Sequence, residues 1–289
     1  MSIQVISINK KKVISNCILL LSIFMMVFSR QVWCEEINDF QYIINDNEVK
    51  IVEYSGNESN IVIPEFIEGK PVVAISEDAF CYENFDDKSY IIDNIYIHKT
   101  VNSVNSYAFN YYFIKNINVD SDNKFYCSED GVLYNKDQSI LIRYPTFRYE
   151  FKISDKVIEI QEAACKHCKI ISANLPKKLE KIGVGAFSTC TKLSKINIPD
   201  SVTYIGDNAF NFVYTDEFHI PKEIEYLGDT STDESIIFHE YNKAVKDYAI
   251  REEILYIPFT KKAIGIFIVG IIVTIIIVKK ILYIKKNKK

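Results

Sequence analysis

The sequence predicts a β-rich solenoid of stacked repeats, with short turns or helical pieces between its strands, followed by one transmembrane helix. The dipeptides Ala186-Phe187 and Ala209-Phe210 lie 23 positions apart, and each follows an Ile-Gly pair by two residues. Similar motifs that recur at one interval are typical of stacked structural units. An uncharged apolar stretch at 263–278 is typical of a membrane-spanning helix.

The N-terminal segment has the layout of a secretory signal peptide. Three lysines at 10–12 precede an apolar stretch at 13–28, which is the order of a signal's charged and hydrophobic regions. We expect a signal peptide over residues 1–34, and cleavage after Cys34 remains open. A lipoprotein signal is an alternative, although Trp33 stands where such a signal would carry a small residue.

The C-terminal apolar stretch is long enough to cross a bilayer once it is extended. Its sixteen residues at 263–278 cover about 24 Å as a helix, against a hydrocarbon core of about 30 Å. Extension through the next six residues gives roughly 33 Å, with Lys279 and Lys280 reaching the interface. We expect a transmembrane helix at 263–284 and a basic cytoplasmic tail at 285–289.

Lysines precede the N-terminal apolar segment and follow the C-terminal one. The positive-inside rule places both lysine clusters in the cytoplasm, so the residues between the two segments lie outside it, whether or not the signal is cleaved. We therefore expect a single-pass cell-membrane protein with an extracellular ectodomain. The segment at 35–258 holds all 38 acidic residues and 22 of the 34 basic residues, a net charge of −16. Such a domain repels phosphate polymers, so we expect no nucleic acid partner.

The sequence IPFTK at 257–261 leaves wall attachment open as an alternative to simple membrane retention. A Pro-x-Thr element before an apolar span and a basic tail is similar to a sortase anchoring signal. Lys261 stands where that signal requires glycine, so we favour membrane retention.

Apolar triplets mark the strands of the predicted repeat. The triplets IVI, IYI, INV, FKI, ANL, INI and FHI begin at residues 61, 95, 117, 151, 173, 196 and 218. Their intervals are 34, 22, 34, 22, 23 and 22 residues. Each long interval is a normal unit that carries an insertion of about 12 residues. In the second insertion, VLY and ILI flank a polar NKDQS turn, which predicts a hairpin near 131–143.

The unit around INI indicates what each repeat position does. Ile196 and Ile198 alternate with polar residues, so a short strand places both isoleucines on one face. Gly206 is expected to permit the turn that follows. Coils of this kind bury their apolar faces only when they stack on one another. The further inward positions are Val202, Ile205, Ala209 and Phe210.

The sequence LPKKLEKIGVGAFSTCTKLSKINIPDSVTYIGDNAF at 175–210 resembles the BspA-like leucine-rich repeat. The resemblance implies a capping segment at 35–60, a leucine-rich-repeat solenoid at 61–259, and adhesion to, or binding of, host or matrix proteins at the cell surface. Two departures are visible, since Cys165 replaces the Phe of the repeat and His98 replaces its Pro.

The motif Cys165-Lys-His-Cys168 could indicate zinc or redox chemistry. Structural zinc needs four ligands in tetrahedral reach, and the sequence offers no second CxxC nearby. The repeat register instead places both cysteines in the solenoid wall, as small buried side chains. It also places Cys168 beside Cys190 on the next coil, so a disulfide between them remains open.

No other constellation indicates catalysis. The sequence lacks a GxSxG, an HExxH, a phosphate-binding glycine loop and a dinucleotide fingerprint, and its carboxylates are scattered over turns. We expect no cofactor, no metal site and no enzymatic activity. A structural envelope protein without a specific ligand is the alternative to a binding module.

The strand alternation predicts a partner-binding face. If Ile196 points inward, Asn197 points outward, and parallel stacking lines up the equivalent side chains along the sheet. The hairpin near 131–143 is the competing site. The predicted row consists of Val62, Tyr96, Asn118, Lys152, Asn174, Asn197 and His219.

Overall fold

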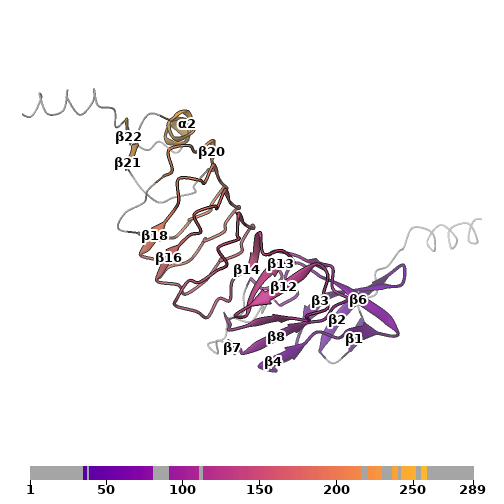
Figure 1. Ribbon diagram of the computed structural model, residues 1–289. Helices are drawn as coiled ribbons and strands as arrows, with labels where there is room; N and C mark the ends of the chain where they lie inside the picture. Colours follow the sequence, from indigo (N-terminus) through magenta and orange to yellow (C-terminus); the bar gives the residue numbers. More distant parts are fainter. Residues whose placement is uncertain are drawn as a thin grey trace, which may run out of the picture. The chain divides into compact units, whose positions relative to one another are not determined.

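A computed structural model describes most of the segment between the two apolar ends (Figure 1). The predicted signal peptide, transmembrane helix and basic tail lie outside the described residues. Within those residues, no helix is long and apolar enough to cross a membrane. The described residues are 35–37, 39–80, 91–110, 113–215, 220–229, 236–239, 242–251 and 255–258.

The N-terminal part of this region is a six-stranded sheet in which antiparallel and parallel pairs are mixed. Asp46 and Asn47, both at positive φ, form the tight turn of its first hairpin, which joins β2 to β3. β3 and β9 both pair parallel with β6. The strands are β1 (Glu35–Ile37), β2 (Phe40–Asn45), β3 (Glu48–Tyr54), β6 (Lys70–Ile75), β5 (Phe66–Ile67) and β9 (Ser103–Val104).

The predicted parallel stacking begins at β4 (Asn60–Val62), β8 (Asn94–Ile97) and β11 (Ile117–Val119). These strands form a three-stranded parallel sheet in the order β11-β8-β4. In β8, Ile95 and Ile97 are buried and Tyr96 is partly exposed, so the predicted alternation is confirmed here. A short parallel pair, β7 (Ile91–Ile92) and β10 (Phe113–Ile114), lies at the preceding turn.

The predicted hairpin is present as β13 (Val132–Asn135) and β14 (Ile140–Arg143), which pair antiparallel. It is one part of a larger meander, because Asp130 and Gly131, both at positive φ, turn the chain from β12 (Tyr126–Glu129) into β13. β14 then starts a parallel ladder with β15 (Glu159–Ile160), β17 (Lys181–Ile182), β19 (Tyr204–Ile205) and β20 (Tyr226–Leu227).

The C-terminal coils also carry a second short ladder, formed by β16 (Ser172–Asn174) and β18 (Lys195–Asn197). The FKI triplet at 151–153, which the repeat predicts to be a strand, is not one. One isolated parallel bridge joins Glu150 to Ser172 instead. Phe151 packs its ring 5.9 Å from the ring of Phe187 and 4.9 Å from that of Tyr144, which supplies aromatic bulk beside Cys165.

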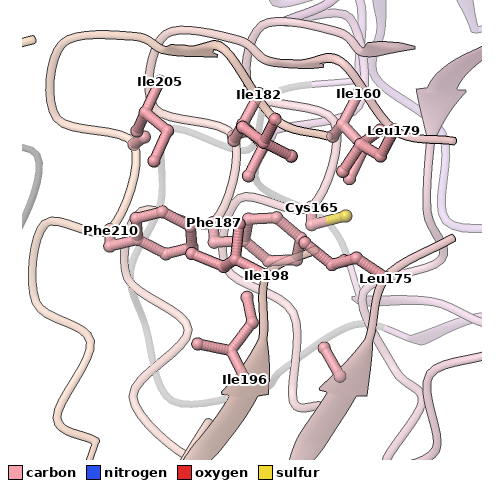
Figure 2. Close-up of a cluster of buried hydrophobic side chains, with 14 of the residues drawn as sticks. Ile160, Cys165, Leu175, Leu179, Ile182, Phe187, Ile196, Ile198, Ile205 and Phe210 are labelled. Atoms are coloured by element: carbon pink, nitrogen blue, oxygen red, sulfur yellow. The ribbon is translucent and has the colours of Figure 1, made fainter. Parts of the chain in front are cut away.

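Side chains at equivalent repeat positions stack from coil to coil inside the solenoid. Figure 2 shows Ile160, Ile182 and Ile205 in one row and Cys165, Phe187 and Phe210 in another. All six are buried, and the rings of Phe187 and Phe210 lie 5.4 Å apart at an interplanar angle of 8°. The predicted stacking of the two phenylalanines is therefore confirmed.

The glycine of each Ile-Gly pair has a different role from the expected one. Gly206 is not among the glycines at positive φ, so its turn does not require glycine on that ground. A Cβ atom there would lie 2.6 Å from the backbone nitrogen of Val184 on the preceding coil. At Gly183 it would lie 2.5 Å from the nitrogen of Glu162, and at Gly228, which follows a leucine instead of an isoleucine, it would meet the nitrogen of Asp207. These glycines allow adjacent backbones to approach closely.

The helix α2 (Lys243–Arg251) covers the last described coil. Asn242 caps its N-terminus by accepting a hydrogen bond from the backbone N–H of Val245 at 3.2 Å, a role that asparagine favours. The amide of Asn242 also donates to the carbonyls of Lys222 and Ile224, and Arg251 donates to that of Leu227. β21 (Ile236–His239) and β22 (Leu255–Pro258) pair parallel beyond it.

Candidate binding face

The parallel register assembles the first part of the predicted row. Tyr96 is paired with Val62 on one side and with Asn118 on the other, so the three side chains stand side by side across β4, β8 and β11. Val62 is 58% exposed, whereas Tyr96 and Asn118 are partly exposed. This part of the row was predicted by the strand alternation alone.

Asparagines join the same three strands through their side chains. Asn94 donates from its amide nitrogen to the Oδ1 atom of Asn60 at 2.6 Å. The Oδ1 atom of Asn94 in turn accepts from the amides of Asn116 and Asn118, both at 3.3 Å. The amide of Asn118 is therefore already engaged within the sheet.

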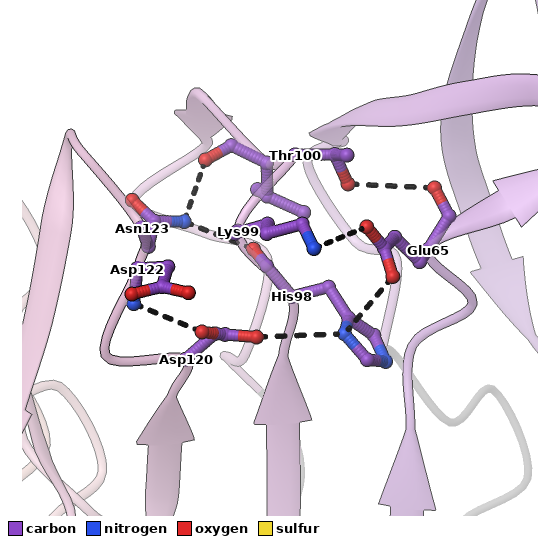
Figure 3. A network of polar contacts seen from close by, with 8 residues as sticks. Glu65, His98, Lys99, Thr100, Asp120, Asp122 and Asn123 are labelled. Carbon is purple, nitrogen blue, oxygen red and sulfur yellow. Dashed lines mark hydrogen bonds and ion pairs between the residues drawn. The ribbon is translucent and has the colours of Figure 1, made fainter.

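A network of charged groups occupies the carboxyl end of these strands. Figure 3 shows the imidazole of His98 between two carboxylates, with Nδ1 at 4.0 Å from Glu65 and at 3.9 Å from Asp120. Lys99 pairs with Glu65 at 3.2 Å. A hydrogen bond from the backbone of Asp122 lowers the pKa of Asp120. His98, which replaces the proline of the repeat, is thus part of a local polar network.

Tyr96 belongs to the same network. Its ring meets that of His98 edge to face, with centroids 5.0 Å apart. Partial burial first, and the nearby carboxylate of Asp120 second, raise the pKa of its hydroxyl. A tyrosine held by two neighbours in this way has less freedom to act as an anchor for a partner than the sequence indicated.

The second part of the row lies on the C-terminal coils and is less constrained. Asn174 pairs with Asn197 in the parallel register of β16 and β18, and both side chains are exposed. Across the region that the structure describes, neither side chain takes part in a hydrogen bond or an ion pair with a protein group. Their amides are therefore available to a partner.

The remaining two predicted residues do not extend this row in the same way. Lys152 lies outside any strand, and its ammonium pairs with Asp130 of the meander at 3.1 Å. His219 lies outside the described residues. The structure thus brings Asn174 and Asn197 together, separately from Val62, Tyr96 and Asn118, and it ties Lys152 to the insertion.

A second exposed row, on the ladder β15-β17-β19-β20, is satisfied by its own members. The Lys181 ammonium pairs with Glu159 at 2.8 Å and lies 5.5 Å from the ring centroid of Tyr204. Tyr204 stacks on Tyr226, with centroids 4.7 Å apart and an interplanar angle of 11°. The hydroxyl of Tyr226 donates to Asp207 at 2.9 Å. This row stabilises the stack and offers a partner little unpaired polar capacity.

The predicted wall positions of the cysteines are confirmed. Cys165, Cys168 and Cys190 are buried and carry free thiols. Burial raises the pKa of the Cys165 and Cys190 thiols, so both are protonated and uncharged at neutral pH. No group of three or more metal-ligating side chains among the described residues is arranged to hold an ion.

A buried arginine that the sequence gave no reason to single out lies beside these thiols. Arg143 donates to the backbone carbonyls of Ala163 at 2.6 Å, Phe109 at 2.9 Å and Lys166 at 3.2 Å. Burial lowers the pKa of its guanidinium, because a charge is less stable away from water. Arg143 therefore ties the N-terminal strands to the C-terminal coils.

The sequence reasoning also missed a partly exposed group of rings and lysines on the turns that lead into β16 and β18. The Lys169 ammonium lies 4.1 Å from the ring centroid of Phe113 and 4.3 Å from that of Phe147. Lys192 lies 5.2 Å from the ring centroid of Tyr149. A signal for these residues exists in the repeat register, since Lys169 and Lys192 occupy equivalent positions four residues before their strand triplets.

One family model matches the repeat motifs that build these coils. The family model described as the BspA type leucine rich repeat region matches residues 146–250 in six copies. Residues 146–250 are BspA-type leucine-rich repeats. These BspA-type repeats comprise the coils from β15 to β20, with their Phe187 and Phe210 stack and the Asn174 and Asn197 pair. No curated protein matches the chain.

Three solved structures are similar to parts of this chain. A leucine rich cell surface protein from Faecalibacterium prausnitzii A2-165 is 26% identical with a TM-score of 0.46, over 70% of this chain and 52% of its own. This chain thus spans about half of that protein's length. The pneumococcal vaccine antigen PcpA is 13% identical with a TM-score of 0.44, over 79% and 99%. A leucine-rich repeat protein from Bacteroides ovatus ATCC 8483 is 18% identical with a TM-score of 0.40, over 73% and 60%.

Proposed function

We propose that this chain is a membrane-anchored, cell-surface module that binds proteins or mediates adhesion through the exposed face of its BspA-type repeats. The partners would be proteins at the cell surface, on a host or in the matrix. We propose no enzymatic activity for the chain. Its support is the match to BspA-type repeats, together with an exposed row on those repeats.

The observation that carries the proposal is the contrast between the two exposed rows. On β15-β17-β19-β20, each side chain is paired with the next along the ladder. On β16 and β18, Asn174 and Asn197 expose amides that form no hydrogen bond with a protein group in the part of the chain that the structure describes. Polar groups that become buried in a complex need hydrogen-bond partners. The donors and acceptors of a binding surface are therefore unpaired with other protein groups in the free chain, and the bound protein pairs with them in the complex.

The experiment is site-specific photo-cross-linking with the full chain displayed on cells. A photoreactive phenylalanine analogue replaces Asn197 in one variant and Lys181 in a matched control. Both positions are exposed strand residues, so the two variants differ in the row that they sample. We expect protein adducts at position 197 and a much lower yield at position 181.

The alternative, a structural envelope protein without a specific ligand, predicts another outcome. Adducts would then be absent, or equally frequent and equally heterogeneous at the two positions. Either pattern would contradict the proposed binding function.

The proposed membrane topology has its own test. An epitope tag is added after Lys289, and protease is applied to intact cells after removal of any wall. We expect digestion of the segment 35–258 and protection of the tag, because the flanking lysines favour the cytoplasm. A tag that is accessible to protease on intact cells would overturn the topology.

A further inference from the structure

A surface that we call the aromatic-lysine row leads into β16 and β18, the strands that carry Asn174 and Asn197. It begins on the short pair β7 and β10 and continues over the turns that lead into β16 and β18. Its members are Phe113, Phe147, Tyr149, Lys169, Ile171 and Lys192.

Backbone hydrogen bonds between coils fix the positions of this row. The N–H of Phe147 donates to the carbonyl of Ile114, and that of Lys169 to the carbonyl of Thr146, both at 3.0 Å. The N–H of Ile171 donates to the carbonyl of Tyr149, also at 3.0 Å. The row is therefore held by the stacking of the coils.

The two ammonium groups are held on aromatic rings. Lys169 lies within cation–π distance of Phe113 and Phe147, and these rings meet edge to face with centroids 6.0 Å apart. Lys192 lies over Tyr149. A cation at such a distance is attracted by the ring quadrupole, which keeps its charge at a defined place on the surface.

Neither lysine is neutralised by a carboxylate of the described residues. Lys99, Lys115, Lys152 and Lys181 pair with acidic side chains, whereas Lys169 and Lys192 form no ion pair with any of the residues that the structure describes. The segment at 35–258 carries a net charge of −16. Two positive charges without counter-ions, fixed in place on an acidic domain, indicate a ligand that brings its own negative charge.

Exposed apolar side chains lie between the two lysines. Tyr149 is 45% exposed and Ile171 is 50% exposed. Ile171 directly precedes β16, the strand that carries Asn174, and the carbonyl of Tyr149 on the preceding coil accepts the backbone hydrogen bond of Ile171. Contiguous exposed apolar side chains with a polar rim are typical of interaction sites. The surface therefore combines positive charge, apolar contact and amide hydrogen bonding.

Ring geometry favours a protein ligand over an acidic polysaccharide. A sugar ring would stack on a free aromatic face, but the ammonium of Lys169 already lies over Phe113 and Phe147. Ile171 has no flat face. Carboxylates that meet the two lysines, together with aliphatic or aromatic side chains that cover Tyr149 and Ile171, are what an acidic polypeptide segment supplies.

We propose that the aromatic-lysine row is the docking site for an acidic segment of the partner protein that also carries apolar side chains. The proposal rests on the protein-binding function above and adds the chemistry of the partner. It places the partner's carboxylates at Lys169 and Lys192 and its apolar groups on Tyr149 and Ile171.

The test uses the full chain, purified in a neutral detergent, and a random copolymer of glutamate and tyrosine as the probe. We expect the copolymer to bind the wild-type chain, with an affinity that falls as salt is added. Lys169→Glu/Lys192→Glu should bind it at least tenfold more weakly. The matched control Lys177→Glu/Lys178→Glu changes the charge equally at exposed lysines of another turn, and it should stay within twofold of the wild type.

Two further measurements separate charge from fold and from apolar contact. Lys169→Gln/Lys192→Gln should lose affinity in the same direction but less, with an unchanged melting temperature. Ile171→Ser should weaken binding of the glutamate-tyrosine copolymer several-fold and leave binding of polyglutamate unchanged.

Equal affinity of the charge-reversed chain and its control would overturn the proposal. So would equal binding of a lysine-tyrosine copolymer. A polyuronate that displaces the acidic copolymer and binds more tightly, with the same dependence on Lys169 and Lys192, would assign the row to acidic polysaccharides instead. If the copolymer fails while position 197 still yields protein adducts, the docking chemistry alone is wrong; absence of both signals rejects the protein-binding function as well.

Discussion

The N-terminal strands and the C-terminal coils differ in how they use the same repeat. Between β4 and β11 the chain carries an insertion, an asparagine ladder and a charge network around His98. From β15 to β20, short coils stack side chains of equivalent repeat positions on one another. The first region uses polar side chains to tie its exposed face together, whereas the second keeps its core regular and leaves part of its face free. Regular stacking thus coincides with the region that we propose for binding.

The largest expected effect concerns the regular core. Phe187→Ala should destabilise the chain by about 3–5 kcal/mol, because it removes a buried ring and leaves a cavity beside Phe210. The equivalent stack in the N-terminal region, Phe80 on Phe109 at 5.2 Å, makes Phe80→Ala the comparison, with a similar cost. Denaturant unfolding measures both.

The control for these cavities is Phe125→Ala, because Phe125 is 51% exposed and its loss leaves no buried cavity. That variant should stay within about 0.5 kcal/mol of the wild type. A small effect of Phe187→Ala together with a large effect of Phe80→Ala would show that the regular coils contribute less to stability than their stacking indicates.

Gly206→Ala should cost about 1–3 kcal/mol, because the added methyl group would press on the backbone of the preceding coil. The added Cβ atom would lie 2.6 Å from the backbone nitrogen of Val184. A backbone atom cannot move aside as a flexible side chain can. Thermal unfolding checks this. A neutral effect would restore the expectation that this glycine serves only its own turn.

Stability of the C-terminal coils should fall in mild acid because of His167. Burial, with smaller contributions from Lys166 and Arg143, lowers the pKa of His167 to about 4, below the value of about 6.5 in an unfolded chain. The unfolded state therefore binds more protons between these values, and stability is lost as the pH falls from about 6.5 to about 4. Allowing for partial solvent exposure, the loss is about 1–2 kcal/mol.

The measurement is the melting temperature against pH for the wild type and for His167→Gln. The variant should be less sensitive to acid over this window. Parallel profiles for the two proteins would contradict the assignment to His167.

The smallest expected effect is at the charge network of the N-terminal strands. Glu65→Gln removes the pairing with Lys99 and the contact with His98, and exposed ion pairs contribute about 0–1 kcal/mol. The difference from the wild type should shrink further in 1 M salt, because salt screens surface charges. A loss above 2 kcal/mol would show that this network has a larger role in the fold.

The periodic part of the structure could be predicted from the sequence. The stacking of Phe187 on Phe210, the outward direction of Asn197 and the wall position of Cys165 all follow from one repeat register. The strand predicted at 151–153 is absent, because Phe151 belongs to the packed ring cluster next to Tyr144, and the register alone does not reveal that.

Contacts across coils were harder to predict from the sequence. The positions of Glu65 and Asp120 around His98 depend on how the chain returns after an insertion. Phe113, Phe147 and Lys169 each lie four residues before a strand triplet, so the register places them in one row, but it does not reveal that the Lys169 ammonium lies over both rings. The role of Gly206 likewise depends on the distance between two backbones, which no single repeat unit contains.

The most direct measurement is the affinity of the partner captured through position 197 for two matched variants of the full chain. Asn174→Asp/Asn197→Asp changes the free amides of the regular coils, and Asn57→Asp/Asn102→Asp makes the same charge change at exposed asparagines of the N-terminal region. We expect at least a tenfold loss of affinity for the first variant, no loss for the second, and unchanged melting temperatures for both. Equal affinities of the two variants would contradict the claim that the exposed face of the regular repeats is the binding surface.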